Sequence, residues 1–131
     1  MANPEVLLSQ FKNENETWKR ILGYLNEENI NLKNHLSEIL ANMTEDRNGF
    51  LERVENFNDL LLKEDEIINF LNFELNEQNK KLIRTIYNNG ELTESVEKNQ
   101  KKLRRDLEIT EQHFNKLKFR FNSYLVENPG V

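Results

Sequence analysis

Apolar residues recur every three or four positions through almost the whole chain of 131 residues. This spacing places them on one face of an α-helix, because the helix completes a turn in about 3.6 residues. Three segments carry such a stripe: Phe11 to Met43, Phe50 to Ile86 and Val96 to Tyr124. Each stripe predicts a long amphipathic helix.

Two short internal stretches, 42–49 and 88–93, gather residue types that end helices, and a third lies at 128–130. Gly90 is typical of the residue that follows a helix, since glycine adopts a positive φ at no steric cost. Thr93 is typical of the cap that begins the next helix. These stretches separate the three predicted helices.

The first internal break allows more than one interpretation. Thr44 favours an N-cap for a helix that starts at residue 45, but the chain could also continue to Asn48 and turn at Gly49, or pass through the break as a kink in one longer helix. We prefer the cap at Thr44. The predicted helices then span about residues 4–42, 45–88 and 93–127.

Short connections force consecutive helices to run antiparallel. We therefore predict an all-α fold in which residues 1–131 form one domain, an elongated up-down-up bundle of three helices with coiled-coil-like packing. The composition agrees, because 37% hydrophobic residues, 31% charged residues and few glycines or prolines favour long helices over a turn-rich β fold. The rival is a two-helix hairpin that pairs with a second copy of the chain.

Polar side chains interrupt the stripes at a few positions. With both breaks as hairpins, an antiparallel register brings three of them within about one helical turn: Asn15, Gln78 and Gln100. We predict a polar core layer at the end of the bundle with the second hairpin. A buried polar residue in a helical seam fixes register; a ligand-binding layer is the alternative. On the first interpretation, Asn15→Leu should raise stability and loosen register.

Asn29 occupies another stripe position where leucine or isoleucine is expected. The same register places it opposite Leu60 or Leu61, without an evident polar partner. A buried unpaired amide costs about 1–3 kcal/mol, so Asn29 either specifies register or lies near the solvent edge. The general abundance of asparagine, 21 residues against two alanines, we interpret as a compositional bias.

Charge and composition narrow the classes of partner. The formal net charge of −5 disfavours nucleic acid and anionic membranes. The absence of cysteine excludes disulfides and thiolate metal sites. No apolar run approaches the roughly 20 residues of a membrane span, and the first residues lack the features of a signal peptide. We expect a cytoplasmic protein without a membrane partner.

The sequence contains no recognisable catalytic or metal-binding motif. Its two histidines, His35 and His113, lie outside the Glu-x-x-His spacing of di-iron bundles and outside any H-E-x-x-H motif. A glycine-rich phosphate loop and a Gly-x-Ser-x-Gly elbow are also missing. We interpret both histidines as surface residues. The sequence predicts no enzyme, no metal, no cofactor and no small-molecule substrate.

One basic patch lies on this acidic chain, within the third predicted helix. It consists of Lys98, Lys101, Lys102, Arg104 and Arg105. We expect it to complement the acidic second helix, either within the bundle or across a partner. A nucleic-acid-associated protein that uses this patch is the alternative, although flanking acids and the lack of interleaved aromatic side chains disfavour it.

Four large apolar residues are not accounted for by the stripes: Leu62, Phe70, Phe73 and Phe119. At about 100° per residue, the first three lie on the far side of the second helix, about 120–160° from the stripe centre. Scattered surface hydrophobes are the alternative interpretation. Because aromatic anchors are typical of binding hot spots, we predict that these residues form a homo-oligomer or partner interface.

A helical rod does not by itself define a function. Since chemistry-bearing motifs are missing and apolar residues remain outside the stripes, we expect a non-enzymatic helical interaction or assembly protein. It would act as an adaptor, spacer or structural subunit through protein–protein contacts.

Overall fold

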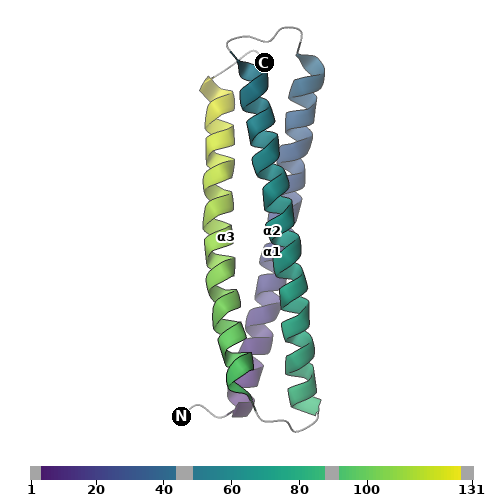
Figure 1. The fold of residues 1–131 in the computed structure, drawn as a ribbon, viewed down its shortest axis with the longest axis vertical. Helices are drawn as coiled ribbons and strands as arrows, with labels where there is room; N and C mark the ends of the chain where they lie inside the picture. Colours follow the sequence, from purple (N-terminus) through teal and green to yellow (C-terminus); the bar gives the residue numbers. More distant parts are fainter. Residues whose placement is uncertain (1–3, 44–48, 88–91, 128–131) are drawn as a thin grey trace.

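The computed structural model describes residues 4–43, 49–87 and 92–127. These residues form three α-helices: α1 (Pro4–Asn42), α2 (Phe50–Tyr87) and α3 (Glu94–Glu127). They lie side by side along one long axis, with α1 and α3 running in one direction and α2 in the other (Figure 1). The predicted all-α, up-down-up bundle of three helices is confirmed.

The start of α3 shows how local sequence sets a helix boundary. The backbone N–H of Val96 donates a hydrogen bond to the Thr93 hydroxyl at 3.2 Å. Thr93 is therefore the N-cap, as its position before Glu94 predicts, and it supplies an acceptor for an N–H group that has no partner inside the helix. Glu94 and Glu97 in the first turn add negative charge at the positive end of the helix dipole.

The start of α2 differs from the sequence prediction. The expected cap Thr44 and first helical residue 45 lie outside the described residues, and α2 begins later, at Phe50. Gly49, directly before it, has a φ of 71°. This left-handed conformation does not occur within a right-handed α-helix and suits glycine, which has no Cβ.

Most of the predicted stripe residues fill one core along the axis of the bundle, where Leu22, Leu25, Leu61, Ile68 and Leu75 are fully buried. A smaller cluster of Leu8, Leu82 and Val96 lies at the end where α1 and α3 begin.

The opposite end of the core is aromatic. The ring of Phe50 stacks on Tyr124 with 5.5 Å between centroids, and Phe57 meets Phe121 edge to face at 5.3 Å. Tyr124 also contacts Phe57. We call these four residues the aromatic end. Their packing joins the first turns of α2 to the last turns of α3.

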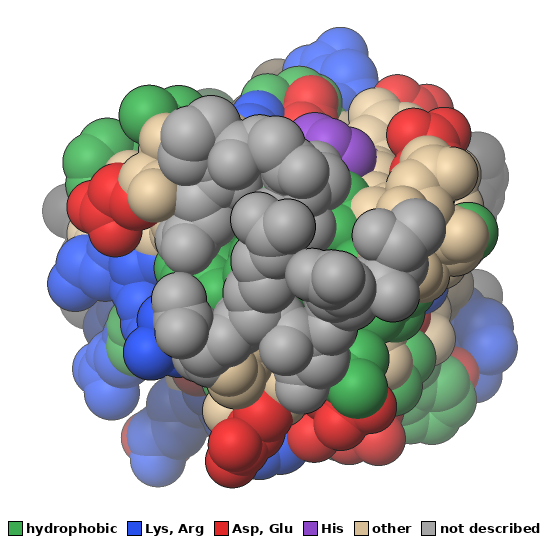
Figure 2. Space-filling model, turned by 90° about the horizontal axis from the view of Figure 1, so that it is seen from above, with side chains coloured by type: hydrophobic (Ala, Val, Ile, Leu, Met, Phe, Trp, Pro, Cys, Tyr) green, Lys and Arg blue, Asp and Glu red, His purple; other side chains and the backbone are tan. Residues whose placement is uncertain are grey.

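The outer surface of the bundle is charged. Seen from above along the long axis, acidic, basic and apolar side chains are interspersed around the rim of the bundle (Figure 2). None of the three described helices contains a stretch apolar enough to cross a lipid bilayer.

Candidate functional site

The structure brings together the three residues of the predicted polar core layer. Asn15 of α1, Gln78 of α2 and Gln100 of α3 are all buried. The Gln100 side-chain N–H group donates to Asn15 Oδ1 at 2.8 Å, and Gln78 Nε2 donates to Gln100 Oε1 at 3.1 Å. One hydrogen-bonded chain therefore links all three helices, between the main core and the small cluster at the end of the bundle.

Further groups complete this layer. Asn15 Nδ2 donates to Asn79 Oδ1 at 2.8 Å, and Gln78 Nε2 also donates to the backbone carbonyl of Val96 at 2.9 Å. Within the described part of the chain, Gln78 Oε1 lacks a hydrogen-bond partner. Since most other donors and acceptors of the layer bind one another, a structural role fits the layer better than a ligand site.

An ion pair between Glu14 of α1 and Arg104 of α3 extends the polar core layer towards solvent. Gln100 Nε2 donates to Glu14 Oε1 at 2.9 Å, and Arg104 donates to both Glu14 oxygens, at 2.6 and 2.8 Å. Burial acts to raise the pKa of Glu14, but the hydrogen bonds from Arg104 and Gln100 and the charge of Arg104 together hold it below its ordinary value. The hydrogen bond to Glu14 raises the pKa of Arg104.

Asn29 does have polar partners, which corrects the expectation from the sequence. It lies opposite Leu61, as the register predicts, and its Nδ2 donates to the Leu61 carbonyl at 2.9 Å and to Asp65 Oδ1 at 2.7 Å. Asp65 also pairs with Lys33 of α1. Asp65 follows Leu61 by one helical turn on the same side of α2, and this spacing is the signal that could have identified the partner.

Another polar contact, which the sequence analysis did not predict, joins a buried residue of α2 to α3. Glu64 interrupts the stripe of α2 and is buried, and its Oε1 meets Nδ1 of His113. The His113 side chain is 60% exposed, in agreement with the surface interpretation, and its Nδ1 nevertheless reaches a buried carboxylate. His35 packs its ring against Phe121. Within the described residues, no group of three histidine or carboxylate side chains could hold a metal ion.

Two residues of the basic patch on α3 form ion pairs with different neighbouring helices. Lys102 pairs with Glu74 of α2 at 3.6 Å, in line with the expected match to the acidic second helix. Arg104 instead pairs with Glu14 of α1. The expectation is therefore wrong for Arg104, because its position on α3 faces the seam with α1.

The other members of the basic patch point away from the neighbouring helices. Lys98 pairs with Glu94 one turn earlier on α3, with both side chains exposed. Lys101 and Arg105 are exposed and form no ion pair with a described residue. Only these two remain as free cations of the patch in the described part of the chain.

All four residues of the predicted interface are exposed. Phe70 and Phe73 are 56% and 62% exposed, and Leu62 and Phe119 also face solvent. Phe70 and Phe73 line two adjoining hollows between α2 and α3, of about 350 and 300 Å³, and Phe70 is shared by both. We call the pair of hollows the α2–α3 groove. Leu62 and Phe119 line neither hollow.

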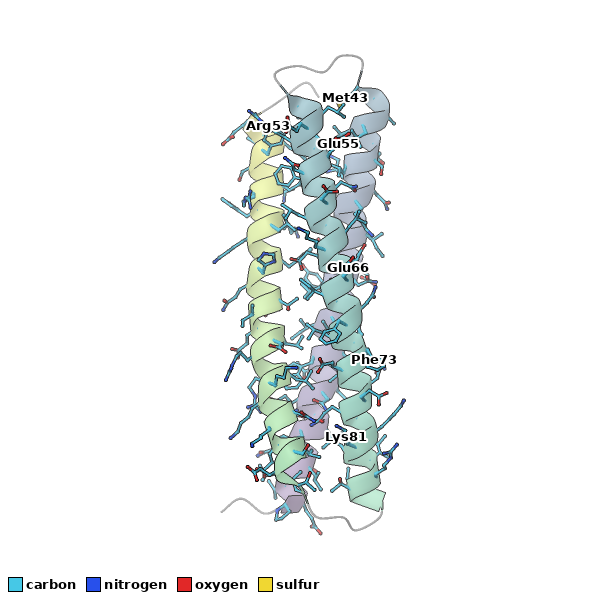
Figure 3. The ribbon with its side chains drawn as sticks, in the orientation of Figure 1. Met43, Arg53, Glu55, Glu66, Phe73 and Lys81 are labelled. Carbon is cyan, nitrogen blue, oxygen red and sulfur yellow. The ribbon has the colours of Figure 1, made fainter. Side chains whose placement is uncertain are left out.

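Two further apolar residues, not among the predicted ones, extend this surface. Ile67 of α2 and Ile109 of α3 are exposed and line the larger hollow with Phe70. Ile67 directly precedes Ile68 and lies at the edge of the stripe of α2, whereas Ile109 lies off the stripe of α3. Together Ile67, Phe70, Phe73 and Ile109 form an apolar face, and Figure 3 shows Phe73 between Glu66 and Lys81 along α2.

Comparison with models of known protein families, with curated proteins and with solved structures gave no match to this chain. The functional argument therefore rests on the bundle and its surfaces.

Proposed function

We propose that this chain is a non-enzymatic helical interaction or assembly protein: an adaptor, spacer or structural subunit that acts through protein–protein contacts. The observation that carries the proposal is the apolar face, where two phenylalanines and two isoleucines from two helices stand exposed around a groove. Clustered exposed apolar side chains mark interaction surfaces more often than isolated ones do. The partner is another protein or a second copy of this chain.

Polar contacts join the two helices beneath this face on either side of it. Glu64 and His113 join α2 to α3 on one side of the apolar face, and Gln78 and Gln100 join them on the other. Side chains on fixed helices lose less entropy on binding than side chains on loops. The apolar face is thus preorganised for contact. The cytoplasmic location predicted from the sequence stays a prediction.

The test is a Phe70→Ser, Phe73→Ser double variant, compared with the wild type by light scattering and by partner pull-down. Tyr24→Ser on α1 is the matched control, because Tyr24 is an exposed aromatic residue that does not line the groove. We expect the double variant alone to lose oligomeric mass or partner recovery. If both variants match the wild type in folding, mass and recovery, the apolar face is not an interface.

A nucleic-acid-associated protein is the second candidate, and the exposed Lys101 and Arg105 favour it. Gel-shift titration tests it directly. Since phosphate contacts weaken with salt, a nucleic-acid protein should bind at about 50 mM salt, and Lys101→Ala with Arg105→Ala should reduce the affinity. Absence of binding at low salt removes this candidate.

A further inference from the structure

The larger hollow of the α2–α3 groove combines apolar walls with unneutralised acids. Ile67 and Phe70 on α2 and Ile109 on α3 supply the apolar surface. Glu66 on α2 and Asp106 on α3 line the same hollow, and no lysine or arginine of the described residues does so. Neither carboxylate forms an ion pair with a described residue. Each wall therefore presents a carboxylate without an ion-pair partner among the described residues beside apolar side chains.

The smaller hollow continues this pattern with a weaker charge. Glu74 and Glu77 line it together with Lys81. Glu74 pairs with Lys102 at 3.6 Å, and Glu77 pairs with Lys80 at 3.0 Å. The charge of this part of the groove is thus largely balanced. The two carboxylates of the groove without an ion-pair partner among the described residues, Glu66 and Asp106, both line the larger hollow.

The shape of the groove favours a helical occupant. From Glu66 to Lys81 the two hollows together extend along α2 for about 22 Å at about 1.5 Å per residue, which is about four helical turns. Its walls are side chains of two helices, and the described residues offer no strand edge to which an extended peptide could add. A helix satisfies its own backbone and needs only apolar anchors one turn apart.

We infer that the α2–α3 groove binds an amphipathic helix of another protein whose apolar stripe is flanked by lysine or arginine. The inference rests on the proposed interaction function and specifies its partner. The apolar stripe packs on Phe70, Ile67 and Ile109, and the flanking cations neutralise Glu66 and Asp106. A second copy of this chain fits less well, because a two-fold axis through the face would bring these carboxylates near their own counterparts.

Two fluorescein-labelled synthetic peptides test the inference with the full chain. Both carry leucine at i, i+3, i+4 and i+7 over about four turns, and they differ only in having lysine or glutamate beside that stripe. Fluorescence anisotropy should show that the lysine peptide binds at least about tenfold more tightly than the glutamate peptide, and that salt reduces the difference. Equal affinities would overturn the inference.

Charge-reversal variants distinguish attraction of the peptide by the groove carboxylates from attraction by the net charge of the chain. Glu66→Lys with Asp106→Lys should invert the preference between the peptides. Glu38→Lys with Glu55→Lys is the matched control, since it changes the net charge equally at exposed positions outside the groove. Circular dichroism checks that both variants fold. If both weaken binding of the lysine peptide to the same extent, net charge alone attracts the peptide and the inference fails.

The Phe70→Ser, Phe73→Ser variant distinguishes failure of the inferred partner chemistry from failure of the proposed interaction function. In the supported case, it loses binding of the lysine peptide. If neither peptide binds the wild type, but the variant still loses partner recovery or oligomeric mass, the inferred partner chemistry is wrong and the interaction function stands. If peptide binding, recovery and mass are all unaffected by the variant, both proposals fail.

Discussion

The two ends of the bundle join their helices by different forces. At the aromatic end, Phe50 and Phe57 of α2 pack against Phe121 and Tyr124 of α3. At the other end, the polar core layer joins three helices through hydrogen-bonded amides. Apolar packing contributes free energy in proportion to the area removed from water and with little direction. Hydrogen bonds contribute less net stability but require defined positions of donor and acceptor.

This difference indicates how a bundle of three similar helices reaches one alignment. A shift of one helix by a turn would still place apolar side chains against apolar side chains along much of the core. The same shift would break the hydrogen bonds that the displaced helix makes in the polar core layer, at about 1–3 kcal/mol for each buried group left unpaired. We therefore interpret apolar packing, at the aromatic end and along the rest of the core, as the main source of stability, and the polar core layer as the source of register.

The largest effect is expected at the aromatic end. Phe121→Ala should lower the free energy of unfolding by about 3–5 kcal/mol, because it leaves a cavity beside Phe57 in a closely packed core. Phe119→Ala is the matched control, since Phe119 lies on the same helix and is 73% exposed. Its effect should stay within about 0.5 kcal/mol. Chemical denaturation measures both, and equal losses would contradict the assignment of the core face.

The next effect concerns Asn15, and the hydrogen bonds reverse the expectation drawn from the sequence. Asn15→Leu removes one acceptor of Gln100 and the donor to Asn79, so we expect a loss of about 1–3 kcal/mol where the sequence alone predicts a gain. Replacing Asn15, Gln78 and Gln100 together with leucine should restore wild-type stability or exceed it, because apolar side chains then fill the whole layer. Chemical denaturation of both variants measures the change.

The register of the helices is measured separately from the stability of the fold. Because the chain has no cysteine, spin labels on single cysteines introduced in α1 and α3 give an unambiguous distance. The wild type should show one narrow distance distribution and the triple leucine variant a broad or multiple one. A narrow, unchanged distribution in the triple variant would show that the apolar core alone selects the register.

The smallest effect is the pH dependence of the Glu14–Arg104 pair. A carboxyl group whose pKa is lower in the folded chain contributes stability above its unfolded pKa of about 4.3 and loses it as the pH falls through the folded pKa. The stability difference between the wild type and Glu14→Gln should therefore be present at neutral pH and shrink in acid. Because the Arg104 side chain is 41% exposed, solvent screening keeps it below about 1 kcal/mol. A difference that is constant from neutral to acid pH would show that the charge of Glu14 does not contribute.

Helix periodicity allowed much of the architecture to be predicted from the sequence. The three stripes identified the core, and their interruptions at Asn15, Gln78 and Gln100 placed a polar layer that the structure contains. Such inferences succeed because the spacing of side chains along one helix is a local property. The exposure of Phe70 and Phe73 follows from the same geometry.

Contacts between helices were decided by the tertiary structure. The pairing of Asn29 with Asp65, of Glu64 with His113 and of Arg104 with α1 depends on how far each helix is rotated about its own axis. So does the position of Ile109 in the α2–α3 groove. A hydrogen bond forms only within a few tenths of an ångström of its ideal length, whereas the apolar spacing of a sequence places a residue only to within about a helical turn. The sequence determined which face of each helix is buried, and packing of the three helices determined which polar groups meet.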